Sequence, residues 1–311
     1  SENPNAEVSE LLMAVENQEI DYTLADTTAY QVHRHYMPDL RIAMQLRDSD
    51  ELAWAFDKRS SSSLRVEAQQ YFDEITANGM LRQILDRYYG HTERFDYVGT
   101  RTFIRHYDTR LGSYEPIFRS AAVETAVDWR LLAAIGYQES HWDPDAVSPT
   151  GVRGLMMLTQ VTADSLGVED REDPSESIAA GARYFAKLHK RLDEIPEPDR
   201  TWFALAAYNV GYGHLQDARR LTRKKGGDPN RWVDVKESLP LLAQRKFYTT
   251  VPHGYARGWE PVQYVANVRN YLGTLNWLTL DRGFEPAPGS EPLPREANLQ
   301  TASGRLPIHT F

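Results

Sequence analysis

The chain has 311 residues, enough for two domains, and its content of 41% hydrophobic and 25% charged residues is typical of a globular protein. A formal net charge of −9 argues against nucleic acid as a partner, and no apolar run is long enough to span a membrane. The absence of cysteine excludes disulfide bonds and a thiol nucleophile, and the 9 histidines lack the spacing of metal ligands. We therefore expect neither a metal nor a cofactor.

Residues 1–100 combine helical and strand-like patterns. Apolar residues recur with a helical period in the first and last parts, and polar and apolar residues alternate in between. The predicted elements are a helix at 7–16, strands at 21–26, 40–46 and 51–56, and two helices within 64–89 that separate at Asn78 and Gly79. This order predicts an α/β domain.

The segments 16–26 and 79–90 resemble the C-terminal part of a periplasmic amino-acid-binding protein. The resemblance implies that Asp26 binds the amino group of a ligand, although an acid at a strand end can also bond its own turn. Because domains of that family are longer than 1–100, we expect a partial solute-binding domain here. It could regulate the rest of the chain or serve only as a structural platform.

Residues 91–112 are polar and aromatic, which is typical of a linker, so we place the domain boundary near residue 100. From Tyr114 onward the pattern is helical almost throughout. The predicted helices cover 115–127, 128–140, 159–167, 173–192, 199–208, 214–222 and 261–278. The predicted fold is therefore α+β and multidomain, with α/β structure over 1–100, an all-α domain over 101–280 and a disordered tail over 281–311.

Glu139 lies near the end of the predicted helix 128–140. Asp128 is a suitable N-cap, and Leu131, Leu132 and Ile135 share the helix face on which Glu139 falls. Burial and the negative end of the helix dipole should both raise the pKa of this carboxyl group. A carboxylic acid that stays protonated near neutral pH can act as a general acid. The alternative is a solvated glutamate at a frayed helix end.

Four short motifs occur in a fixed order over the second half of the chain. They are Glu139 with Ser140, Gly154 with Leu155 and Met156, Ala207 with Tyr208 and Asn209, and Tyr264 with Val265. In this order they resemble the lytic transglycosylases of the goose-lysozyme-like superfamily. The resemblance implies a lysozyme-like fold for 101–280 and a role in the cleavage of peptidoglycan glycan strands.

The resemblance also implies a mechanism. Glu139 protonates the oxygen that joins N-acetylmuramic acid to N-acetylglucosamine, and afterwards takes a proton from the muramoyl C6 hydroxyl as a 1,6-anhydro ring closes. The implied substrate-binding residues are Ser148, Met156, Met157, Tyr208, Asn209 and Tyr264. Met157 stands where the family usually has glutamine. Four aromatic residues could stack on sugar rings or pack in the core, namely Trp142, Tyr212, Tyr255 and Trp259.

Further expectations concern partners and location. We expect a monomer in the periplasm, attached to the outer membrane through a segment that precedes residue 1, with stem peptides of the cell wall as possible ligands of 1–100. We also expect 101–280 to cleave peptidoglycan as well as the whole chain does. The alternatives are a hydrolase of the goose-lysozyme kind, which needs a residue that positions water, and a wall-binding or sensing protein with a degenerate catalytic domain.

Overall fold

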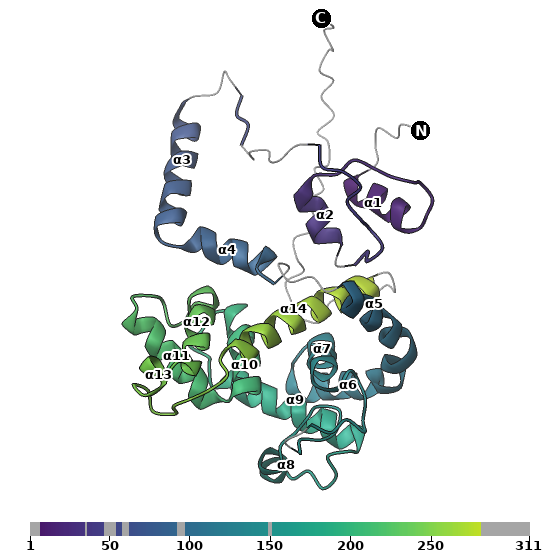
Figure 1. Ribbon diagram of the computed structural model, residues 1–311, viewed down its shortest axis with the longest axis vertical. Coiled ribbons are helices and arrows are strands. Elements are labelled where there is room, and N and C mark those ends of the chain that lie inside the picture. Colours follow the sequence, from purple (N-terminus) through teal and green to yellow (C-terminus); the bar gives the residue numbers. More distant parts are fainter. Residues whose placement is uncertain are drawn as a thin grey trace, which may run out of the picture.

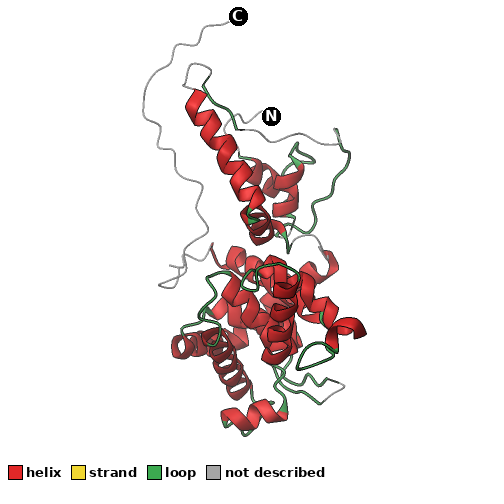
Figure 2. Ribbon diagram, turned by 90° about the vertical axis from the view of Figure 1, so that its left-hand side faces the viewer, coloured by secondary structure: helices red, strands yellow, loops and turns green. Residues whose placement is uncertain are grey.

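A computed structural model describes most of the chain. The described residues are 7–34, 36–46, 54–57, 62–91, 97–148 and 151–280. Over these residues the structure is built from helices, with isolated β-bridges that join Val147 to Arg153 and Arg153 to Leu158 (Figure 2). The tail over 281–311, which the sequence predicts to be disordered, lies outside the described residues.

The first two helices, α1 (Val8–Glu16) and α2 (Thr27–His33), lie together at one end of the molecule, above the C-terminal part of α14 (Figure 1). They pack around a small apolar cluster of Leu12, Met37 and Leu40. Tyr36 stacks on Trp277 of α14 at 5.8 Å between ring centroids, which joins this end to the rest of the molecule.

The strands predicted at 21–26 and 40–46 are wrong, and the described part of 1–100 is not α/β. Among the described residues neither segment forms a strand or has a strand beside it, and a strand cannot persist without a neighbour for its hydrogen bonds. The third predicted strand lies partly outside the described residues, and 54–57 has no regular structure. The alternation therefore does not bury one face: Leu24 remains 72% exposed and Met44 73% exposed.

The predicted helical pair is confirmed as α3 (Ser62–Ala77) and α4 (Met80–Tyr89). Gly79 divides them with φ +76°, a left-handed conformation that costs glycine little. In Figure 1, α3 projects away from the molecule, whereas α4 lies close to the helices of the second half.

The predicted linker at 91–112 is helical over its described part. Helix α5 (Tyr97–His106) passes into a π-helical turn (Tyr107–Leu111) and then into α6 (Gly112–Thr125). Phe103 and Leu111 are each 1% exposed, so this segment forms part of the core. The polar residues that suggested a linker occupy the outer side of these helices.

The remaining helices form a compact bundle with α7 at its centre. They are α7 (Trp129–Ser140), α8 (Gln160–Leu166), α9 (Pro174–Lys190), α10 (Asp199–Val210), α11 (Tyr212–Lys224), α12 (Trp232–Ser238), a 3₁₀ turn (Leu239–Ala243), α13 (Arg245–Tyr248) and α14 (Trp259–Leu280). The predicted caps are confirmed: Asp128 accepts from the Arg130 backbone N–H at 2.9 Å, and Asp173 accepts from that of Glu176 at 2.9 Å.

Helix α7 is buried on nearly every side, because α6 and α14 pack against it and α9 touches it as well (Figure 1). The four consecutive residues Leu132, Ala133, Ala134 and Ile135 are fully buried. A helix apolar all round belongs in the centre of a fold. None of the described helices has the length and hydropathy that crossing a membrane requires.

Candidate active site

Glu139 lies in the last turn of α7, where the buried helix reaches the edge of the core. Its Oε1 accepts a hydrogen bond of 2.6 Å from the hydroxyl of Tyr264 on α14. The chain turns sharply right after it, because His141 and Trp142 both have positive φ values, of 54° and 57°. Helix α7 therefore ends directly after Ser140, with the carboxyl group of Glu139 in its last turn.

The carboxyl group of Glu139 is a weaker acid than that of an ordinary glutamate. Burial raises its pKa from 4.5 to about 7, and the hydrogen bond from Tyr264 lowers it in part. The predicted rise is confirmed, with desolvation as its main cause. Near neutral pH a substantial fraction of Glu139 is thus protonated, which is the state from which a general acid works.

Two tyrosine side chains lie at this carboxyl group, and a third lies beside one of them. Tyr208 of α10 stacks on Tyr264 at 6.5 Å between ring centroids, and Tyr184 of α9 lies 5.3 Å from Tyr208. Burial raises the pKa of both Tyr208 and Tyr264 well above the ordinary value, and the nearby charge of Glu139 raises both further. These phenols therefore stay neutral, and they enclose Glu139 in an apolar setting with a few oriented O–H groups.

The segment 154–157 passes beside Glu139 and is fixed through its backbone. Ser140 Oγ donates to the Leu155 carbonyl oxygen at 2.8 Å, and the Tyr208 hydroxyl donates to that of Met156 at 3.0 Å. The Met156 N–H in turn donates to Ser177 Oγ on α9 at 3.1 Å. Three helices thus hold this one stretch of chain, and Ser140 takes part by binding its backbone.

Two glycines are required for this arrangement. Gly154 has φ +77°, and a Cβ there would lie 1.8 Å from the carbonyl oxygen of Arg171. A Cβ at Gly181 would lie 2.8 Å from the side chain of Met156. Met156 is fully buried against α9, and its backbone N–H and carbonyl oxygen are both hydrogen-bonded within the protein.

The other predicted binding residues occupy different positions around the site. Asn209 is exposed at the end of α10, directly after Tyr208. Met157 is partly buried with φ 46°, an unusual conformation for a non-glycine residue. Ser148 is partly buried and its hydroxyl oxygen accepts from the Val152 N–H at 3.1 Å, so it closes a loop. The structure thus brings Tyr208 and Tyr264 to Glu139, and none of these contacts joins Asn209, Met157 or Ser148 to it.

The four aromatic candidates divide into two kinds. Trp142 is 1% exposed and its indole N–H donates to the Ala133 carbonyl oxygen at 2.8 Å, so it is a core residue and cannot stack on a sugar. Tyr212 lies under the guanidinium of Arg191 at 3.8 Å. Tyr255 is 54% exposed and Trp259 is 50% exposed, in the stretch that leads into α14. Only the last two retain a free face.

Asp26 lies far from this constellation, at the start of α2. Its Oδ1 accepts from the Ala29 N–H at 2.8 Å, so the carboxylate caps that helix. Among the described residues no group of three or more His, Cys, Asp or Glu side chains is arranged to hold a metal ion.

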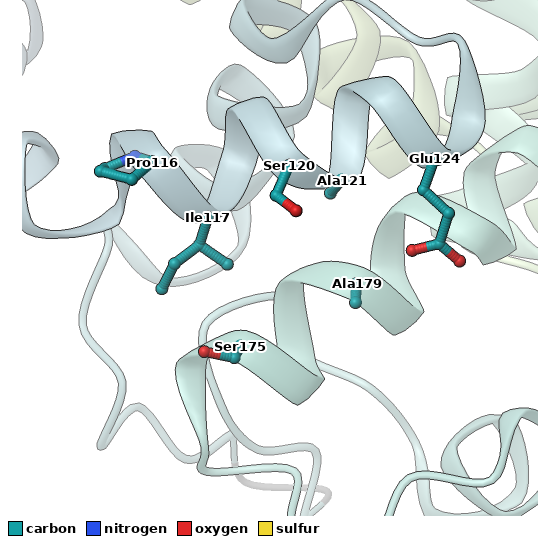
Figure 3. Close-up of a pocket in the computed structure, with 7 residues that line it drawn as sticks. All are labelled: Pro116, Ile117, Ser120, Ala121, Glu124, Ser175 and Ala179. Atoms are coloured by element: carbon teal, nitrogen blue, oxygen red, sulfur yellow. The ribbon is translucent and has the colours of Figure 1, made fainter.

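A pocket of about 370 Å³ lies elsewhere, between α6 and α9 (Figure 3). It is lined by Pro116, Ile117, Ser120, Ala121, Glu124, Ser175 and Ala179. In Figure 3 the side chains of Ile117 and Glu124 project from α6 toward α9. No interaction described above joins a residue of this pocket to Glu139. We therefore assign general acid catalysis to the end of α7 and not to this pocket.

Sequence reasoning missed two residues that shape the site. Tyr184 extends the row of tyrosines, and Ser177 holds the backbone of Met156. Both lie on α9, whose apolar period predicts a helix but not which side chains face Glu139. A polar residue on an otherwise apolar face, such as the fully buried Ser177, is the signal that could have drawn attention to them.

Comparison with known proteins identifies the class first. The family described as Transglycosylase SLT domain matches residues 116–230, which include α7, α9, α10 and the segment 154–157. The chain is also 53% identical over 94% of its length to membrane-bound lytic murein transglycosylase F 1 of Alkalilimnicola ehrlichii. It is 52% identical over 88% of its length to the membrane-bound lytic murein transglycosylase F of Ectopseudomonas mendocina. The chain thus contains the Transglycosylase SLT domain over residues 116–230 and is similar over most of its length to proteins named membrane-bound lytic murein transglycosylase F.

The matches cover only part of these relatives. The chain spans 59% of the Alkalilimnicola protein and 56% of the Ectopseudomonas protein. Among solved structures, the 70 kDa soluble lytic transglycosylase of Escherichia coli is 23% identical, with a TM-score of 0.40 over 53% of this chain and 24% of that one. A TM-score of this size supports no conclusion.

Proposed function

We propose that the chain is a peptidoglycan lytic transglycosylase that cleaves the β-1,4 bond between N-acetylmuramic acid and N-acetylglucosamine without consuming water. One observation carries the proposal: Glu139 combines a pKa of about 7 with a 2.6 Å hydrogen bond from Tyr264 at the end of a buried helix. Similarity to relatives named lytic murein transglycosylases supports the substrate.

Two proton transfers suffice for this reaction. Protonated Glu139 gives its proton to the glycosidic oxygen as the bond from that oxygen to the muramoyl C1 breaks. Ionised Glu139 then takes the proton of the C6 hydroxyl as the C6 oxygen bonds to C1, which closes the anhydro ring. The acid ends as it began, and no atom enters or leaves besides the two sugar products.

A single carboxyl group fits this site better than a pair. Glycosidases that use two carboxylates need both of them beside the scissile bond. The nearest acids in sequence, Asp143 and Asp145, are exposed, and Asp143 accepts from the Asp145 N–H at 3.1 Å within its own turn. The acetamido group of the substrate is therefore the proposed stabiliser of the cationic ring carbon.

Tyr264 has a defined part in this cycle. Its hydroxyl donates to Oε1 of Glu139, so it stabilises the ionised state that exists between the two proton transfers. Tyr208 and Ser140 bind the backbone of 154–157, and we propose Asn209, Ser148 and Met157 as contacts to the sugars. These substrate contacts are part of the proposal.

Analysis of the products by mass spectrometry tests the proposed function. Purified peptidoglycan digested by the chain should yield fragments with 1,6-anhydro-muramoyl ends. Reducing ends, heavier by one water, would instead identify a hydrolase of the goose-lysozyme kind. The absence of cleavage, with the chain still bound to the sacculi, would identify a wall-binding protein.

The remaining parts of the proposal concern location and control. We place the protein in the periplasm, attached to the outer membrane, because its relatives are named membrane-bound. We propose a monomer and stem peptides as ligands of the N-terminal region. Asp26 is exposed and its carboxylate already caps α2, so a peptide amine there would have to share that carboxylate with the helix. Binding of a stem peptide by the chain but not by Asp26→Ala would support this role.

A further inference from the structure

Asp86 of α4 lies in a buried ionic contact with the second half of the chain. It is 9% exposed, and its Oδ2 is 3.5 Å from Nη1 of Arg269 on α14. Its other carboxylate oxygen pairs with Lys236 of α12. Buried charges are costly to desolvate and are tolerated when they are paired, as these are.

Arg269 does more than neutralise this carboxylate. It is 5% exposed, and its Nη2 donates to the backbone carbonyl oxygens of Asp86 and Arg87, at 2.8 Å each. These carbonyls belong to the last turn of α4, so the guanidinium caps the end of that helix. The same guanidinium lies 4.8 Å from the ring centre of Trp202 on α10. One side chain therefore joins α4, α10 and α14.

Other polar contacts hold α4 in the same place. Gln83 donates to Oδ2 of Asp199, the first residue of α10, at 3.1 Å. The Asn78 carbonyl oxygen, just before α4, accepts from Arg231 at 2.7 Å. Figure 1 shows α4 lying across these helices, whereas α3 projects away from them. By its contacts, α4 is part of the bundle that carries Glu139.

The two helices that Arg269 joins also carry the tyrosines of the site. Tyr264 precedes Arg269 by five positions on α14, which corresponds to a rise of about 7.5 Å and a rotation of about 140°. Tyr264 thus faces Glu139 from one side of α14, and Arg269 faces α4 from the other. Tyr208 follows Trp202 on α10. The contact with Asp86 therefore stabilises α10 and α14, the two helices that set the position of the tyrosines.

We propose that Asp86 is a positioning residue of the active site, which acts through Arg269 to keep the Tyr264 hydroxyl within hydrogen-bonding distance of Glu139. This inference rests on the proposed transglycosylase function. It also moves α4 into the catalytic unit, so the functional boundary lies before Asn78 and not near residue 100.

Substitution in the whole chain tests the proposal. Asp86→Asn keeps the size of the side chain but removes the carboxylate that pairs with both Arg269 and Lys236. If Tyr264 drifts from Glu139, the hydrogen bond that lowers the pKa of Glu139 weakens, so the fall of activity at alkaline pH should move to higher pH. We expect kcat on peptidoglycan to fall about tenfold, since small displacements at a catalytic group cost rate steeply. KM should change little, because Asp86 touches no substrate.

Glu237→Gln is the matched control. Glu237 pairs with Arg82 of α4 at 3.0 Å, but its side chain is 57% exposed, and exposed pairs contribute little. We expect wild-type rate and pH profile. Lys236→Met is a milder second variant that leaves the Asp86 pair with Arg269 intact, and it should shift the profile in the same direction by a smaller amount.

The outcomes separate two failures. An inactive wild-type chain would contradict the proposed function itself. An active wild type with unchanged kcat and pH profile in both Asp86→Asn and Lys236→Met would overturn the positioning role, even if either variant melts at a lower temperature. If Asp86→Asn does not fold, the pH profile of Lys236→Met is decisive. A fall of activity that moves to higher pH supports the positioning role of Asp86, and an unchanged profile contradicts it.

Discussion

The two ends of this molecule differ in how much apolar surface each one buries. The helices from α5 to α14 share one continuous core that includes fully buried residues such as Phe118, Leu132 and Phe203. The described part of 7–57 has the small cluster of Leu12, Met37 and Leu40, and leaves Tyr22 83% exposed and Trp54 62% exposed. A large core fixes side chains in single positions, whereas a small one cannot.

This difference explains why the chemistry lies in the second half. A general acid must be desolvated to keep its proton, and it must be held at one distance from its partners. The bundle meets both needs, since it buries α7 on nearly every side and brings the Tyr264 hydroxyl to Glu139. The first half has a capping carboxylate at Asp26, but it stays exposed and caps its own helix. Helix α4 is the exception, because it precedes the bundle in sequence and yet packs within it.

The largest effect is expected at the acid. Glu139→Gln should lower the rate of peptidoglycan cleavage about a thousandfold, since general acid catalysis contributes roughly 10²–10⁴ in rate. The fold should persist because the replacement has the same shape. Above pH 7 the variant should also be more stable than the wild type. The folded-state pKa of Glu139 is raised, so in the wild type the cost of the buried charged form develops as pH rises, and glutamine never carries that charge. Cleavage rates and melting curves at pH 5 and pH 8 measure both effects, and wild-type activity in this variant would exclude Glu139 as the acid.

Core substitutions should separate the two ends. Leu132→Ala in α7 should destabilise the chain by about 2–5 kcal/mol, as large-to-small changes in a packed core do, and should remove activity at temperatures where the bundle melts. Leu12→Ala in the small cluster should cost less and leave the rate unchanged. Chemical denaturation and cleavage assays measure both. Equal losses of activity in the two variants would show that the ends depend on each other more closely than their cores suggest.

Removal of residues 1–100 should sharpen the comparison at α4. The sequence predicts that 101–280 cleaves as well as the whole chain, but this deletion removes the carboxylate of Asp86 and the two carbonyl oxygens of α4 that hold Arg269. If α4 belongs to the catalytic bundle, we expect a loss of about tenfold or more, because α14 then loses contacts that fix its position and small displacements at a catalytic group cost rate steeply. A matched deletion of residues 1–77, which keeps α4, should retain most of the activity. Equal rates for the two shortened chains would favour the boundary near residue 100.

The smallest effect is expected at Tyr264. Wild-type activity should fall as pH rises through the pKa of Glu139, about 7. Tyr264→Phe removes the hydrogen bond that lowers this pKa, so the fall should move to higher pH, by less than about one unit, while the rate decreases a few-fold. Tyr208→Phe is the control, because its hydroxyl bonds the Met156 carbonyl oxygen and not Glu139. A shift to lower pH in Tyr264→Phe would contradict the assigned role of that hydroxyl.

Local features of the structure followed from the sequence. The helix over 128–140, the caps at Asp128 and Asp173 and the division of α3 from α4 at Gly79 depend on residues within a few positions of one another. Glu139 could be chosen as the acid for the same reason, because its place on an apolar helix face is a local property. The strands at 21–26 and 40–46 were wrong because a strand depends on a partner that its own pattern does not contain.

The sequence by itself thus determined most of the helices and their caps, and it singled out Glu139 as the proposed acid. Only the tertiary structure decided what surrounds that acid and what supports it. Tyr264 reaches Glu139 across 125 positions, and Arg269 reaches the backbone of Asp86 across 183. Contacts over such separations arise from the packing of whole helices, which places side chains that no local period distinguishes. The pKa of Glu139 belongs to this second class, since it is set by burial beneath helices that lie far away in the chain.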